Sequence, residues 1–150
     1  MVTLEEDYDA ALIVASASDN PEVLIFNRYS FEGLFSFIEY YQKEVESKID
    51  YINKKALFDN TDALIEICKK DARKIKKLAK IIKSDIFISL DGAQIRQDIV
   101  TYNLSIVLDR NGIIKVNESD IWSVLRILDD DCVKSDVTGN KYLAHAKIRV

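Results

Sequence analysis

Residues 59–83 carry the pattern that decides the fold, and they read DNTDALIEICKKDARKIKKLAKIIK. The run Asp59-Asn60-Thr61 supplies side chains that cap a helix N-terminus. Apolar residues then recur at steps of three and four, as one buried face of a helix requires. They are Leu64, Ile65, Cys68, Ala72, Ile75, Leu78, Ala79 and Ile82. The spacing predicts an amphipathic helix that continues to the end of this stretch.

The same stretch holds a strong excess of positive charge. Between Lys69 and Lys83 there are eight basic residues and one acid, Asp71, so the segment carries +7 within a chain of net charge −4. Local potential, rather than total charge, governs how a surface meets phosphate groups. The basic residues are Lys69, Lys70, Arg73, Lys74, Lys76, Lys77, Lys80 and Lys83. We call these eight residues the basic cluster.

A helical projection separates the apolar and basic residues of this segment. With Ile75 at zero and steps of about 100°, the apolar stripe lies within about 60° of one direction, and the cations occupy about 100° to 260°. Ile81 falls inside the cationic arc, so we expect it to pack against a partner. Like charges at i, i+4 cost roughly a few tenths of a kcal/mol per pair, so the arc needs a counter-charge. Asp129-Asp130-Asp131 is the internal candidate.

The rest of the chain is predicted as hairpins and helices. Apolar runs indicate a hairpin over residues 10–29, and Ser30 caps a long helix that ends near Lys54. A helix is expected over 93–103, a hairpin with an Asn-Gly turn over 104–116, a short helix ending near Asp130, and a last strand over 141–150. The predicted fold class is α+β: a small antiparallel sheet built from hairpins, packed with three to four helices in a single domain over 1–150.

The order of several motifs points to a known family. The run Asn27-Arg28-Tyr29-Ser30-Phe31-Glu32-Gly33-Leu34-Phe35 opens a helix, ahead of the basic helix and the hairpin turn Asp109-Arg110-Asn111-Gly112. Near the carboxyl end stands Ser135-x-x-Thr138-Gly139-x-x-Tyr142, followed by Lys147. From Ala10 to Val150 the chain resembles the carboxyl-terminal portion of the KwaB-like B-component family of the bacterial Kiwa anti-phage defence system.

This resemblance implies a soluble, DNA-associated effector that works with a membrane protein of the defence system. Family members typically carry a further amino-terminal part. The resemblance singles out Thr138, Gly139, Tyr142 and Lys147 without giving them a role. A structural account suffices for three of them, since Gly139 permits a tight turn, Tyr142 anchors the last strand and Lys147 pairs with a carboxylate.

Residues for catalysis or for holding a cofactor are sparse. His145 is the only histidine, and Cys68 and Cys132 lack the C-x-x-C spacing of a zinc site. We expect both thiols to be reduced and buried, and we expect no cofactor and no metal. The carboxylates of Asp129-Asp130-Asp131 suit Mg²⁺, but consecutive helical residues point about 100° apart and cannot all converge. We therefore expect no enzyme activity, with a metal-dependent nuclease as the minority alternative.

Neither a membrane span nor a secretory leader is expected. The longest apolar run covers residues 10–15, far below the roughly eighteen residues that cross a bilayer. The first nine residues are acidic where a leader is basic. These patterns predict a cytoplasmic protein that does not insert into a membrane.

Two functions follow from the basic cluster. The first is sequence-nonspecific DNA binding, in which all eight cations contact the phosphate backbone; neutralising four to six phosphates predicts a log K against log salt slope of roughly −4 to −5. The alternative is a protein-interaction or dimerisation module whose basic helix docks on an acidic surface of a partner or second copy. Exposed Tyr40, Tyr41 and Trp122 would suit that interface. Docking of the cations on the chain's own carboxylates would explain the cluster without nucleic acid.

Overall fold

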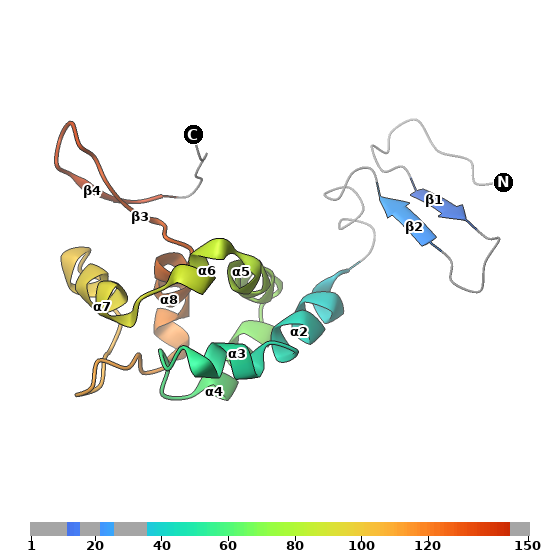
Figure 1. The fold of residues 1–150 in the computed structure, drawn as a ribbon, viewed down its shortest axis with the longest axis horizontal. Coiled ribbons are helices and arrows are strands. Elements are labelled where there is room, and N and C mark those ends of the chain that lie inside the picture. Colours follow the sequence, from blue (N-terminus) through green and yellow to red (C-terminus); the bar gives the residue numbers. More distant parts are fainter. Residues whose placement is uncertain (1–11, 16–21, 26–35, 145–150) are drawn as a thin grey trace. The chain divides into compact units, whose positions relative to one another are not determined.

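The computed structural model describes residues 12–15, 22–25 and 36–144, and the chain divides into two units, Met1–Glu39 and Tyr40–Val150. In the first unit, β1 (Leu12–Ala15) pairs antiparallel with β2 (Glu22–Ile25), with Leu12 opposite Ile25 (Figure 1). This pairing confirms the hairpin predicted over 10–29 in its described part. The expectation of a single domain over 1–150 stays a prediction, alongside the division of the chain into two units.

The long helix predicted to end near Lys54 is two helices in its described part. Helix α2 spans Ile38–Glu46 and α3 spans Ile49–Lys54. Between them the Ser47 hydroxyl donates to the Glu44 carbonyl at 2.7 Å, and the Lys48 N–H donates to the Val45 carbonyl at 3.0 Å. A serine side chain that bonds the preceding turn competes with the helical ladder, which accounts for the break. The predicted cap Ser30 lies outside the described residues.

The predicted helix over 59–83 is also two helices. Helix α4 spans Thr61–Lys69 and begins as expected, with the Asn60 side chain accepting from the Ala63 N–H at 2.9 Å. Helix α5 spans Ala72–Lys83. Asp71 separates them, because its extended backbone places its carboxylate to accept the Arg73 N–H at 2.8 Å. Aspartate is more favourable as a helix N-cap than inside a helix. Asp71, the one acid between Lys69 and Lys83, therefore marks the start of a second helix.

Three further helices complete the second unit. Helix α6 spans Asp85–Ser89 and was not predicted; the Ser84 side chain caps it by accepting from the Phe87 N–H. Helix α7 spans Gly92–Thr101, close to the predicted 93–103. Helix α8 spans Ile121–Leu128 and follows a short 3₁₀ helix, η1, which spans Glu118–Asp120. Helix α8 confirms the short helix predicted to end near Asp130.

The predicted hairpin over 104–116 is wrong as a pair of strands. The turn forms, with Gly112 at φ +78°, but Leu108 and Ile114 meet only in an isolated bridge. The Asp109 carboxylate accepts the Ile113 N–H at 2.8 Å. Two backbone bonds join the arms, from the Asp109 N–H to the Ile113 carbonyl and from the Lys115 N–H to the Val107 carbonyl, both at 2.8 Å. The Ile114 N–H donates to the Leu57 carbonyl at 2.9 Å.

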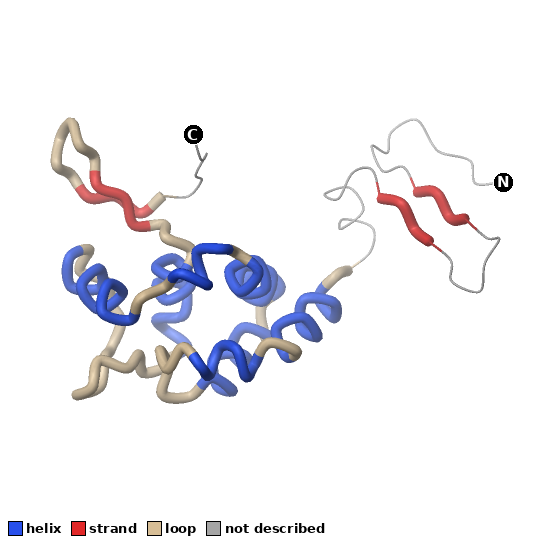
Figure 2. Tube along the Cα trace, viewed as in Figure 1, coloured by secondary structure: helices blue, strands red, loops and turns tan. Residues whose placement is uncertain are grey.

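The carboxyl-terminal strands form their own hairpin. Strand β3 (Cys132–Lys134) pairs antiparallel with β4 (Lys141–Leu143), in the register Cys132↔Leu143. The predicted last strand over 141–150 is therefore short in its described part, and the hairpins do not join in one sheet. Figure 2 shows strands only in two short hairpins among the described residues. The described residues also form seven α-helices, α2 to α8. The fold class α+β is confirmed, with more helix than the expected three to four.

Helix α5 lies at the centre of the packing. It contacts α4, α6 and α8, and its buried residues are Ile75, Leu78, Ala79, Ile81 and Ile82. The expectation that Ile81 faces a partner is wrong, because it is fully buried. Neighbouring helices cover a wider arc of α5 than the apolar stripe of the helical projection predicted. The cations therefore share a narrower exposed face, bordered on both sides by residues of other elements.

Candidate nucleic-acid interface

The basic cluster begins at the end of α4 and follows α5. Lys69 is the last residue of α4, Lys70 follows it, and the other six cations lie on α5. The prediction that these residues are helical is thus confirmed for all but Lys70. What decides their chemistry is which carboxylates the fold brings to them.

Helix α2 supplies carboxylates to both ends of the basic cluster. Lys69 Nζ lies 2.6 Å from Glu46 Oε1 and 2.7 Å from Glu66 Oε1. Lys83 Nζ lies 3.2 Å from Glu44 Oε2, donates to the Tyr40 hydroxyl at 3.0 Å and sits over the Tyr40 ring. The hydrogen bond to Glu46 raises the pKa of Lys69, and the bond to Tyr40 raises that of Lys83. Both lysines remain cationic with partners in place.

The loop after α8 holds Lys77 between two carboxylates. Lys77 Nζ donates to Asp129 Oδ2 at 2.9 Å and to Asp131 Oδ2 at 2.8 Å, and these carboxylate side chains are only 12% and 8% exposed. Burial lowers the pKa of Lys77, but the bonds to Asp131 and Asp129 outweigh it and raise the pKa. Asp130 takes a φ of +55°, so the chain turns sharply between its neighbours. Two of the three consecutive carboxylates therefore converge on the Lys77 ammonium.

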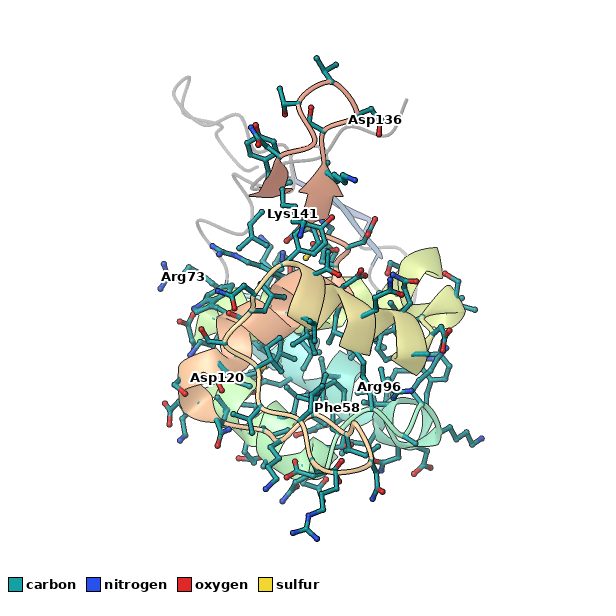
Figure 3. The ribbon with its side chains drawn as sticks, turned by 90° about the vertical axis from the view of Figure 1, so that its left-hand side faces the viewer. Phe58, Arg73, Arg96, Asp120, Asp136 and Lys141 are labelled. Carbon is teal, nitrogen blue, oxygen red and sulfur yellow. The ribbon has the colours of Figure 1, made fainter. Side chains whose placement is uncertain are left out.

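Three cations of the cluster are well exposed and have only long ion pairs. Lys70, Arg73 and Lys80 side chains are 63%, 82% and 76% exposed. Their nearest carboxylates, on Glu118, Asp71 and Asp129, lie at 3.7, 3.5 and 3.9 Å. Such exposed pairs are worth about 0 to 1 kcal/mol and are screened by salt. We call Lys70, Arg73 and Lys80 the exposed ridge; Figure 3 shows Arg73 extending outward.

The remaining two cations are partly buried. Lys76 Nζ lies 5.9 Å from the centre of the Tyr41 ring, a cation–π contact, and the charge of Lys74 opposes the burial that raises the pKa of Cys68. The expectation of one continuous open arc is therefore wrong. Lys69, Lys77 and Lys83 already hold carboxylates at 2.6 to 3.2 Å. Asp129 and Asp131 were the predicted internal counter-charge, and the structure confirms that they take this role for Lys77.

Sequence reasoning missed Glu44 and Glu46 as partners of the cluster. They lie on α2; helix α3 lies between α2 and the helix that ends at Lys69, and helices α3 and α4 lie between α2 and the helix that ends at Lys83. Spacing along one helix cannot reveal a pair formed between helices. The only signal in the sequence was the excess of acidic residues outside residues 69–83. This excess indicates that carboxylates are available to pair with the cluster, but not which ones.

The motif residues Thr138, Gly139 and Tyr142 lie in and after the β3–β4 turn. Gly139 takes a φ of +70° and its N–H donates to the Ser135 carbonyl at 2.8 Å, which confirms the tight turn. The Thr138 hydroxyl accepts the Asn140 N–H. Tyr142 is half exposed and accepts from the Asn140 amide, so it does not anchor the strand in a core. Lys147 lies outside the described residues.

The three aromatic residues expected to be exposed differ in their burial. Tyr40 is half exposed, Trp122 is partly buried and Tyr41 is buried, so the expectation is wrong for Tyr41. Tyr41 packs edge-on against Tyr40, with 5.7 Å between the ring centres. Only one of the three therefore offers an exposed ring to a protein partner.

The described residues supply little for catalysis. Both cysteines are free thiols, as expected. Cys68 is buried, and this burial raises its pKa to about 12, whereas Cys132 is partly exposed, so the expected burial is wrong for Cys132. Among residues 36–144, the His, Cys, Asp and Glu side chains form no group of three suited to a metal ion. His145 lies outside the described residues. No helix of the described chain has the length and apolar character to cross a bilayer.

Comparison with known proteins decides the family. The model of the family described as "Kiwa protein KwaB-like" matches residues 1–138. The chain belongs to the KwaB-like family of Kiwa proteins. No curated protein and no solved structure matches the chain significantly. KwaB-like membership associates the chain with anti-phage defence.

The KwaB-like match contains the whole basic cluster together with Glu44, Glu46, Asp129 and Asp131. It ends at Thr138, inside the β3–β4 turn. Gly139, Tyr142 and Lys147, which belong to the carboxyl-terminal motif of the resemblance, therefore lie beyond the matched residues. The interface built on α5 lies within the family's matched region, and the terminal motif does not.

Proposed function

We propose that this KwaB-like protein acts in anti-phage defence by binding the phosphate backbone of DNA through the exposed ridge, without catalysing a reaction. The observation that carries the proposal is the exposure of Lys70, Arg73 and Lys80, which are 63% to 82% exposed and have no ion pair shorter than 3.5 Å. Ammonium and guanidinium groups of this kind supply the nonspecific part of DNA affinity. The proposal places the protein in the cytoplasm.

The spacing along α5 suits a row of phosphates. Arg73 and Lys80 are seven residues apart, which is about 10.5 Å of helix rise and about 20° of rotation. Arg73 and Lys80 therefore project from nearly the same side of α5, where both can contact one phosphate backbone. A lysine-rich ridge contacts phosphates as point charges rather than reading base edges, so little sequence preference is expected.

The structure lowers the expected number of phosphate contacts. Three exposed cations, instead of four to six, predict a log K against log salt slope of about −2.7. Lys69, Lys77 and Lys83 are left out because their ammonium groups are already bonded, and Lys74 and Lys76 because their side chains are partly buried. The proposal is therefore of modest, strongly salt-dependent affinity.

The test is duplex DNA binding by the full chain, followed by fluorescence anisotropy at several salt concentrations. In the variant Arg73→Glu/Lys80→Glu, the slope should fall in magnitude by about 1.8, because two contacts are lost. The matched control is Lys54→Glu/Arg110→Glu, which reverses one exposed lysine and one exposed arginine away from α5. Equal slopes for the ridge variant and the control would remove the ridge from the function.

The second candidate function is docking on an acidic protein surface. It is favoured by the contacts of Lys69, Lys77 and Lys83, which show that this face accommodates carboxylates. It is weakened by the burial of Tyr41. Concentration-dependent dimerisation in sedimentation experiments, with no DNA binding at low salt, would favour docking over the DNA proposal.

A further inference from the structure

We infer that Glu44 and Glu46 of α2 determine how many phosphates the basic cluster can hold, because they occupy Lys83 and Lys69 and confine DNA to the exposed ridge. This inference rests on the proposed DNA binding and concerns residues outside the ridge. It assigns a specificity-determining role to two carboxylates of a helix that carries no part of the basic cluster.

The contacts lie at the two ends of the basic cluster. Lys69 precedes α5 and Lys83 ends it, and both ammonium groups bond carboxylates of the same helix, α2. Their distances of 2.6 and 3.2 Å are shorter than any ion pair of the ridge. A phosphate that approaches Lys69 or Lys83 must therefore displace a carboxylate at close range.

These two lysines are within reach of a ligand. The Lys69 and Lys83 side chains are 24% and 44% exposed, and Glu46 is 47% exposed. Lys77 differs, because its partners Asp129 and Asp131 are nearly buried. Removing the α2 carboxylates together with Glu66, the second carboxylate on Lys69 at 2.7 Å, therefore frees two cations at the surface. Removing Asp129 or Asp131 instead disturbs the packing against α8.

The carboxylates also act on DNA by their own charge. An anionic side chain beside the ridge repels a phosphate at the edge of the contact, and like-charge juxtaposition is a common means of rejecting binding modes. With Glu44 and Glu46 in place, the ridge is bordered by negative charge on its α2 side, and by Asp129 near Lys80. The binding surface is thus a narrow positive strip.

The test compares DNA binding by wild type and Glu44→Gln/Glu46→Gln/Glu66→Gln across salt, with Glu66 included because it would otherwise still hold Lys69. Two added contacts should take the slope from about −2.7 to about −4.5. Raising salt from about 50 to 200 mM would then weaken binding about 500-fold in the variant, against about 40-fold in wild type. The control Glu39→Gln/Asp50→Asn removes two exposed carboxylates from α2 and α3 that have no ion pair among the described residues. It should keep the wild-type slope.

A second pair of substitutions keeps the inference testable if the glutamine variant fails to fold. Lys69→Gln/Lys83→Gln should leave the wild-type slope unchanged, because these ammonium groups are already occupied. A fall of about 1.8 in its magnitude would show that DNA already reaches both lysines, and would overturn the inference. In the glutamine background the same two substitutions should abolish the gain.

The outcomes separate the inference from the proposed function. Wild type that fails to bind duplex DNA at about 50 mM salt contradicts the proposed function itself. Wild type that binds with a slope near −2.7, beside a glutamine variant whose slope equals that of the control, overturns only the role of Glu44 and Glu46.

Discussion

Replacing Lys77 with Met should destabilise the helical unit more than other single changes in the basic cluster. Removing one partner of a buried ion pair costs about 3 to 5 kcal/mol, because the remaining charge stays desolvated. Lys77 keeps 23% exposure, so water can reach part of the site, and we expect about 2 to 3 kcal/mol. For a chain of this size, that corresponds to a fall in Tm of about 4 to 12 °C. Met retains the length and helix propensity of the side chain, so the lost ammonium dominates.

The free energy of unfolding can be measured by urea denaturation followed by circular dichroism. The control Lys54→Met removes an exposed ammonium on α3 and should change stability by less than about 0.5 kcal/mol. Lys77→Arg keeps a cation between Asp129 and Asp131 and should recover most of the loss. A Lys77→Met protein as stable as the control would refute the view that this cluster joins α5 to the end of α8.

Two further predictions concern α5 and its neighbour α4. Asp71→Ala removes the cap that accepts the Arg73 N–H, and should cost about 1 kcal/mol in the urea midpoint analysis; no loss would mean that α4 and α5 do not depend on it. Cys68, whose pKa burial raises to about 12, should resist iodoacetamide at pH 8 in native protein while Cys132 reacts, as located by mass spectrometry. Because this folded-state pKa is raised from 9.0, the stability due to the neutral thiol is present below pH 9 and is lost as pH rises toward 12. Equal labelling of the two thiols would contradict this burial.

Local patterns predicted the helices well where one stripe of apolar residues decided them. The stripe through Leu64, Ile75 and Leu78 places α4 and α5 correctly, and Asn60 caps α4 as expected. The same patterns missed the breaks at Ser47 and Asp71. In each case a polar side chain forms a hydrogen bond with nearby backbone and competes with the helical hydrogen bonds. The spacing of apolar residues does not predict this competition.

Contacts between distant segments account for the other differences. The Ile114 N–H, after the Gly112 turn, bonds the Leu57 carbonyl, and the turn sequence alone does not specify that partner. Ile81 is buried because several helices surround α5, whereas a helical projection assumes one covered face. The pairs from Lys69 and Lys83 to α2 likewise depend on helix packing. The sequence therefore identifies the cationic residues but does not predict which of them the fold leaves exposed.

The most direct test of the proposed function is the salt dependence of duplex DNA binding by the unmodified chain. The three cations of the exposed ridge predict a log K against log salt slope of about −2.7. Absence of binding at low salt would contradict the DNA interface. A slope of about −4.5 or steeper would contradict the internal neutralisation of the cluster that the structure shows.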